Sequence, residues 1–240
     1  MSPRLAIGVL THNRVPLLVD TLESLFAYNP DLQNVVLVDN GSDGNVQNEN
    51  RAVAKRFGLR YVLNVQTSAD VDTNKKIEVG VRRLIQEVLD EDSDICCLLQ
   101  DDWRCLDCIP VDAAWEFLCT HQNIGQLRLR DFKYDDSFDG GSSINFVTHL
   151  KIHFSERIVV GDASFDVGEL HWVDSCNLMR RAVLETIATP FSSEIDRMRV
   201  FHQLHPSNAQ LRPGIFRHTG PCRIRPELRE KGLFAHADIP

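Results

Sequence analysis

Four short, uninterrupted apolar runs alternate with stretches of helical periodicity in the first hundred residues, and this pattern constrains the fold more than any other feature. The runs are Leu5–Leu10, Asn34–Asp39, Tyr61–Val65 and Ile95–Leu99. Continuous apolar runs are typical of strands buried on both faces, as in parallel sheets covered by helices. The pattern therefore predicts an α/β fold with a mostly parallel central sheet flanked by helices.

The later part of the chain is less regular. The first helix is expected to begin at Pro16 and to end at Asn29-Pro30. After Pro110, strands and helices no longer alternate evenly. A strand is predicted over 125–130, and the alternating segments 149–154 and 157–160 predict antiparallel strands joined around Ser155 and Glu156. These strands would form a smaller antiparallel part of the fold.

Two helices are predicted after residue 180, the first ending at Pro190 and the second opening at Ser192 and Ser193. The apolar face of the second helix is predicted to consist of Ile195, Met198, Phe201 and Leu204. We find no internal repeat or linker, so residues 1–240 are expected to form one domain.

Polar residues follow each of the predicted parallel strands. In open α/β sheets, ligands bind beyond the carboxyl ends of the strands. Residues 11–14, 39–43, the loop before Lys75 and residues 101–103 should therefore line one crevice.

Composition excludes several classes of protein. No run of 18 apolar residues occurs among the 240, and polar residues follow the first apolar run too soon for a signal peptide, so we expect neither a membrane span nor a secretory leader. The seven cysteines favour reduced, packed thiols and a cytoplasmic location. Cys105 and Cys108 have no partner pair with which to hold structural zinc.

Charge is distributed unevenly along the chain. The formal net charge is -8, yet from Arg212 to Lys231 six basic side chains stand against two acidic ones. A basic segment on an acidic body is typical of a local anion site, although a solvated surface segment has the same composition.

Three motifs in order resemble a known family. Residues 7–14 (IGVLTHNR), 36–43 (VLVDNGSD) and 98–103 (LLQDDW) resemble the nucleotide-sugar-binding half of GT-A glycosyltransferases, especially the inverting family 2. The resemblance implies a GT-A (Rossmann-like) fold, with residues 1–105 as the nucleotide-sugar-binding half and 106–240 as the acceptor-binding half. It also implies a UDP-sugar or related nucleoside diphosphate-sugar donor.

The resemblance assigns roles to polar residues of the first half. The residues expected to hold the donor are Thr11, Asn13, Arg14, Asp39, Asn40 and Lys75. Asp39 has an alternative role, because Asp-Asn-Gly-Ser is also a good tight turn.

Asp101 and Asp102 are adjacent carboxylates at the end of a buried strand, an arrangement that favours a cation. Hard ions such as Mn²⁺ or Mg²⁺ accept one or two carboxylates and leave other positions to diphosphate oxygens. The pair resembles a variant of the GT-A metal motif (DxD), which makes Asp102 the expected metal ligand and places Asp101 toward the sugar or ribose. Gln100 departs from the acidic residue that begins that variant.

The segment His218-Thr-Gly resembles one that GT-A enzymes fold over the diphosphate. By this resemblance His218 is a second metal ligand, and Arg223 and Arg225 bind phosphate. For a base that activates the acceptor, the resemblance points to Asp196, with Glu194 second. A capping role is the alternative for Asp196, since Ser193-x-x-Asp196 has capping-box spacing.

The sequence favours a metal-dependent glycosyltransferase of inverting type, with a glycan, a protein or a small molecule as acceptor. Hydroxymethylated DNA of the phage type is an alternative acceptor, given the basic segment. Two other classes stay open: a nucleotidyltransferase, and a non-catalytic nucleotide-sugar-binding protein.

Overall fold

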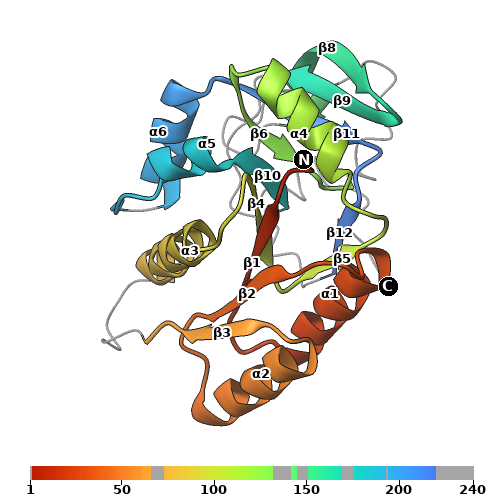
Figure 1. Ribbon diagram of the computed structural model, residues 1–240. Coiled ribbons are helices and arrows are strands. Elements are labelled where there is room, and N and C mark those ends of the chain that lie inside the picture. Colours follow the sequence, from red (N-terminus) through yellow and green to blue (C-terminus); the bar gives the residue numbers. More distant parts are fainter. Residues whose placement is uncertain are drawn as a thin grey trace, which may run out of the picture.

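The computed structural model describes residues 2–65, 73–131, 142–144, 151–168, 176–192 and 194–219, and its centre is a ten-stranded sheet (Figure 1). The first half of the sheet is parallel and consists of β1 (Leu5–Thr11), β2 (Asn34–Asp39), β3 (Arg60–Leu63) and β4 (Ile95–Gln100), in the order β3-β2-β1-β4. β1, β2 and β4 are almost wholly buried, whereas the edge strand β3 is partly exposed. The predicted parallel sheet is confirmed.

Helices cover both faces of this sheet. Alternate residues of β1 point to opposite sides: Ile7 and Val9 pack in one apolar cluster with α1 (Val15–Tyr28) and α2 (Gly44–Arg56), whereas Ala6 packs in a second with α3 (Thr73–Leu89). Gly8 lies directly under α3, where a Cβ would clash with Val88. The two clusters explain why the strands carry no polar face.

The second half of the sheet is mixed. Beyond β4 the order continues β10 (Asn177–Arg180), β6 (Ile124–Arg128), β11 (Ser207–Arg212), β9 (Ala163–Gly168), β8 (Lys151–Val160) and β7 (Ser142–Ile144). Neighbours here are antiparallel, except that β11 runs parallel to β6. The helices of this half are α4 (Val111–Thr120), α5 (Arg181–Thr186) and α6 (Glu194–Leu204). The predicted antiparallel part is confirmed.

A separate pair of strands joins the two halves. β5 (Trp103–Cys105) follows β4 and pairs antiparallel with β12 (Phe216–His218), near the C-terminal end of the described chain (Figure 1). This pairing brings His218 opposite Trp103.

Two details of the sequence prediction were wrong. The strands expected to meet around Ser155 and Glu156 are one continuous strand, β8, in which a bulge at these residues shifts the register, and the chain turns instead at Gly161 with a positive φ of 56°. In α6, Leu204 is exposed and Arg197 is fully buried. An ion pair with Glu78 of α3 accounts for the burial of this arginine.

The six described cysteines are free thiols; Cys108 and Cys119 are exposed and the other four are buried. Within the described ranges, no helix has both the length and the apolar character that crossing a membrane requires.

Candidate functional site

Asp101 lies at the carboxyl end of β4 and is fully buried. Its Oδ2 accepts a hydrogen bond of 2.6 Å from Thr11 Oγ1 and a longer one of 3.3 Å from the backbone N–H of His12, both at the end of β1. Burial raises the pKa of the Asp101 carboxyl to about 6, against the opposing charge of Arg14. The ends of two adjacent parallel strands thus meet at this carboxylate.

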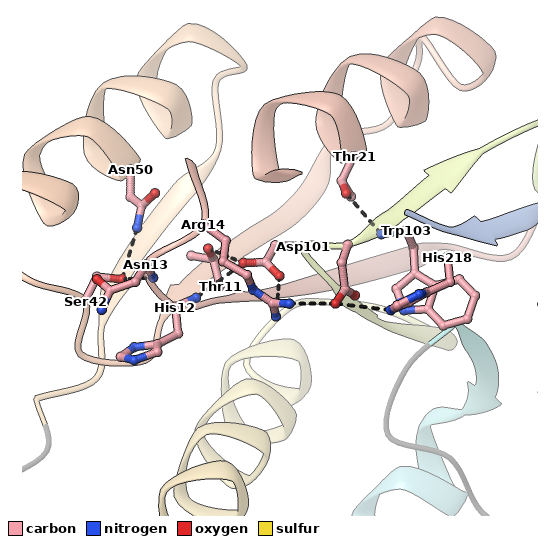
Figure 2. A network of polar contacts seen from close by, with 11 residues as sticks. Thr11, His12, Asn13, Arg14, Thr21, Ser42, Asn50, Asp101, Trp103 and His218 are labelled. Atoms are coloured by element: carbon pink, nitrogen blue, oxygen red, sulfur yellow. Dashed lines mark hydrogen bonds and ion pairs between the residues drawn. The ribbon is translucent and has the colours of Figure 1, made fainter. Parts of the chain in front are cut away.

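Arg14 spans both acidic residues. Its Nη2 lies 2.7 Å from Asp101 Oδ1 and its Nη1 lies 2.7 Å from Asp102 Oδ2 (Figure 2). The arginine side chain is 37% exposed, whereas the two carboxylates are buried. One guanidinium therefore bridges two adjacent carboxylates from the solvent side of the site and offsets part of their negative charge.

His218 reaches the same carboxylate from the other direction. Its Nε2 lies 3.4 Å from Asp102 Oδ2, and the backbone N–H of Thr219 donates to the Asp102 carbonyl at 2.8 Å. Burial opposes the ionisation of Asp102, but the contact with His218 and the charge of Arg14 outweigh it and hold the pKa of this carboxyl below its usual range. The anion is thus the stable form of Asp102.

The indole of Trp103 packs against the imidazole of His218. The two rings meet edge to face with centroids 5.1 Å apart, and the guanidinium of Arg130 lies 4.8 Å above the indole. Sequence reasoning placed Trp103 in the predicted crevice without a chemical role, and it did not single out Arg130. The position of Trp103 directly after the acidic pair was an available signal, whereas nothing local marks Arg130.

Asp102 and His218 fit an open metal site. Asp102 Oδ1 is buried and accepts no hydrogen bond from the described residues, so this oxygen has a lone pair to offer. No three His, Cys, Asp or Glu side chains of the described ranges converge as a complete cage. An ion here would need further ligands from diphosphate oxygens and water, as is usual for Mg²⁺ and similar ions.

Asp39 makes the contacts of a turn anchor. It is fully buried; its Oδ1 accepts the Ser42 N–H at 2.8 Å, and its Oδ2 accepts hydrogen bonds from Asn50 Nδ2 and the Tyr61 hydroxyl, both at 2.9 Å. The turn alternative recognised in the sequence is therefore the role that these contacts fulfil. A direct contact between Asp39 and a donor stays a prediction.

Asn13 ties the first loop to that turn. Its backbone adopts a positive φ of 56°, its N–H donates to Ser42 Oγ at 2.9 Å, and its Oδ1 accepts the Asp43 N–H at 2.8 Å (Figure 2). Asparagine tolerates this left-handed conformation better than most residues. The contacts agree with the prediction for residues 11–14, 39–43 and 101–103, whereas residues 66–72 of the loop before Lys75 lie outside the described residues.

Asn40 connects the turn to α3. Its Nδ2 donates to the Lys76 carbonyl at 3.1 Å, and its Oδ1 accepts Asn64 Nδ2 at 2.8 Å. A Cβ on Gly80 would lie 2.5 Å from Asn40 Nδ2, so only glycine fits there without a shift. Lys75 belongs to the first turn of α3, and its side chain lies outside the described residues.

The two candidate bases lie at the start of α6. Asp196 accepts a hydrogen bond from Ser192 Oγ and pairs with Arg199 at 3.3 Å, contacts that a helix-start role provides. Glu194 is the first residue of the helix, and its side chain lies outside the described residues, as do Arg223 and Arg225.

Comparisons with known proteins give matches among solved structures alone. No protein-family model matches the sequence, and no curated protein matches it. The structure of GalNAc-T7 with UDP, GalNAc and Mn²⁺ aligns with a TM-score of 0.64 at 8% identity, covering 92% of this chain and 45% of that one. The mannosyltransferase PcManGT from Pyrobaculum calidifontis, with GDP-Man and Mn²⁺, aligns at 0.54 and 14% identity, covering 93% and 59%.

A third match is S. aureus TarS 1-349, with a TM-score of 0.53 and 15% identity over 90% of this chain and 60% of that one. This chain thus spans between 45% and 60% of the length of these three structures. At such low identities the likeness concerns the fold. The arrangement of the sheet and helices, together with these matches, shows that the chain has the GT-A fold.

Proposed function

We propose that this chain is a glycosyltransferase that transfers a sugar from a nucleoside diphosphate-sugar to an acceptor hydroxyl with the help of a divalent metal. The observation that carries the proposal is the meeting of Asp102, His218 and Arg14 at the carboxyl end of β4 in a GT-A fold. The solved structures of similar fold support it, because GalNAc-T7 was determined with UDP and Mn²⁺ and PcManGT with GDP-Man and Mn²⁺.

Asp102 and His218 are the residues that would hold Mn²⁺ or Mg²⁺. When bound, such an ion neutralises negative charge on the departing nucleoside diphosphate. Thr11 holds the carboxylate of Asp101 beside it, and Asp101 is proposed to face the sugar or the ribose.

The donor side is built by the turn around Asp39. Asp39 accepts the backbone N–H of Ser42 and thereby holds the turn, while Asn13 and Asn40 connect this turn to β1 and α3. We propose that these residues form the nucleoside side of the site. Lys75, Arg223 and Arg225 are proposed to contact the diphosphate, on the strength of the sequence resemblance.

For the acceptor, Asp196 is the proposed general base of an inverting transfer, with Glu194 second. A carboxylate in this role accepts the proton of the acceptor hydroxyl as that oxygen attacks the anomeric carbon. The proposed acceptor is a hydroxyl of a glycan, a protein or a small molecule, and UDP-sugars are the first donors to test.

Nucleotide release tests the proposal. UDP-sugars and GDP-mannose are incubated with the protein and Mn²⁺, and released nucleotide is measured for the wild type, Asp102→Asn and the control Asp107→Asn, whose exposed carboxylate lies five residues further along the chain. We expect metal-dependent release that falls about 100-fold or more in Asp102→Asn and is unchanged in the control. Equal release by the wild type and Asp102→Asn, or release that persists in chelator, would exclude this site.

A further inference from the structure

Arg14 has a place in the site that donor binding alone does not explain. Its two terminal nitrogens each meet a different carboxylate at 2.7 Å, so the guanidinium bridges Asp101 and Asp102 instead of gripping one of them. Figure 2 shows the guanidinium of Arg14 reaching from the loop after β1 to Asp101. The contact uses the same carboxylate that would bind the metal.

The charges require such a bridge. Two adjacent carboxylates, one fully buried and the other nearly so, repel each other in a medium that screens poorly. Arg14 supplies a positive charge to both of them. In the described structure this guanidinium therefore acts as the counter-cation of the acidic pair.

A divalent ion bound to Asp102 would destabilise the contact between this guanidinium and the acidic pair. Both are cations, and an ion on Asp102 would lie within a few ångströms of Arg14 Nη1, where like charges repel strongly. Binding of the ion thus favours departure of the arginine from Asp102. The side chain is more than one-third exposed, so it has a path toward solvent.

We propose that Arg14 competes with the divalent metal for Asp102 and keeps the metal affinity of the site low until a diphosphate is present to take the guanidinium. The inference rests on the proposed function and adds an order of binding to it. A diphosphate offers oxygens that a guanidinium binds bidentately, so the displaced arginine gains a new partner. Metal and nucleoside diphosphate then bind cooperatively, and by linkage each strengthens the other by the same factor.

The test is the affinity for Mn²⁺ alone, measured by electron paramagnetic resonance of free Mn²⁺ or by calorimetry. The variants are Arg14→Gln and Arg14→Lys, with Arg104→Gln as the matched control. Arg104 lies two residues from Asp102 but is 58% exposed and pairs weakly with Asp20 at 3.7 Å. Its replacement removes the same charge from the neighbourhood without touching the acidic pair.

We expect Arg14→Gln to bind Mn²⁺ about tenfold more tightly than the wild type, the factor that corresponds to one charged hydrogen bond. Arg14→Lys should fall between the two, because an ammonium group cannot bridge both carboxylates. Arg104→Gln should change the affinity less than about twofold, as expected for an exposed charge. Adding UDP should raise the affinity for Mn²⁺ more in the wild type than in Arg14→Gln.

Mn²⁺ binding that is equal or weaker in both Arg14 variants would overturn the competition and leave the proposed function standing. A gain of the same size in Arg104→Gln would also overturn it, since bulk charge would then be the cause. If neither the wild type nor any variant binds Mn²⁺, with or without UDP, the inference and the metal-dependent function fail together.

Discussion

Arg197 of α6 pairs with Glu78 of α3 inside the apolar layer between these helices. The guanidinium is fully buried, its Nε donates to Glu78 Oε2 at 3.2 Å, and its Nη1 donates to the carbonyl of Ile187. The ring of Phe191 lies 4.8 Å from the guanidinium carbon. The pair therefore ties the helix that carries Asp196 to the helix that adjoins Asn40.

Removing one partner of this pair should be costly. We expect Arg197→Met to lower the free energy of unfolding by about 3–5 kcal/mol, because Glu78 is left as a buried, unpaired charge. The double variant Glu78→Met/Arg197→Met should recover most of that loss, since two apolar side chains of similar volume replace the ions. Urea unfolding of both variants is the measurement, and additive losses would contradict this account.

Gly80→Ala should destabilise the protein although alanine normally favours helices by about 1 kcal/mol. The new methyl group would press on Asn40, whose amide is held by Lys76 and Asn64, at a cost of about 1–3 kcal/mol. Gly44→Ala is the control, because a Cβ there meets nothing within 4 Å. Thermal unfolding compares the two, and an equal response at both glycines would rule out the contact with Asn40.

The environment of Tyr61 predicts that the stability of the folded protein decreases at alkaline pH. Burial and the hydrogen bond to Asp39 raise the pKa of Tyr61 well above its usual range. Because the folded state holds the proton more tightly than the unfolded state, this contribution is fully present below about pH 10 and is lost as the pH rises further. Urea midpoints at about pH 8 and about pH 11 should differ less for Tyr61→Phe than for the wild type. The exposed Tyr28 provides the control, Tyr28→Phe, which should behave like the wild type.

Asp196→Asn separates catalysis from helix capping. As the base, Asp196 should be needed for turnover but not for UDP binding, so the variant should lose about 100-fold or more in turnover with an unchanged UDP affinity. Ser192→Ala removes the hydroxyl that donates to Asp196 and should cost about 0.5–2 kcal/mol of stability with turnover nearly retained. Normal turnover of a less stable Asp196→Asn would assign the residue to capping alone.

The sequence was sufficient for those parts of the site that adjacent strands bring together. Thr11 and Asp101 each follow a continuous apolar run, and the carboxyl ends of neighbouring parallel strands must meet, so their contact could be predicted. The turn at Asp39 could also be recognised, but two of its three partners, Asn50 and Tyr61, come from separate elements and no local pattern marks them.

Long-range contacts set the limit of sequence reasoning. Arg197 has no local signal that it will be buried, because its partner lies 119 residues earlier in the chain. The bulge in β8 shifts the alternation of side chains at Ser155 and Glu156, and a shifted alternation is easily taken for two strands. Arg14 bridges both aspartates from a loop whose geometry depends on the contact between Asn13 and Ser42. The motifs contain these residues but do not reveal that contact.

Because β12 pairs with β5, neither half of this chain can be exchanged as an independent unit. His218 reaches Asp102 only because the chain returns to the first half after completing the mixed sheet. A fragment that stops after β5 would carry the acidic pair and Arg14 but lack one of the two proposed metal ligands. A hybrid of the first half with a second half from another protein would therefore also need the short strand at 216–218. A hybrid joined at residue 105 without that strand would have an incomplete metal site.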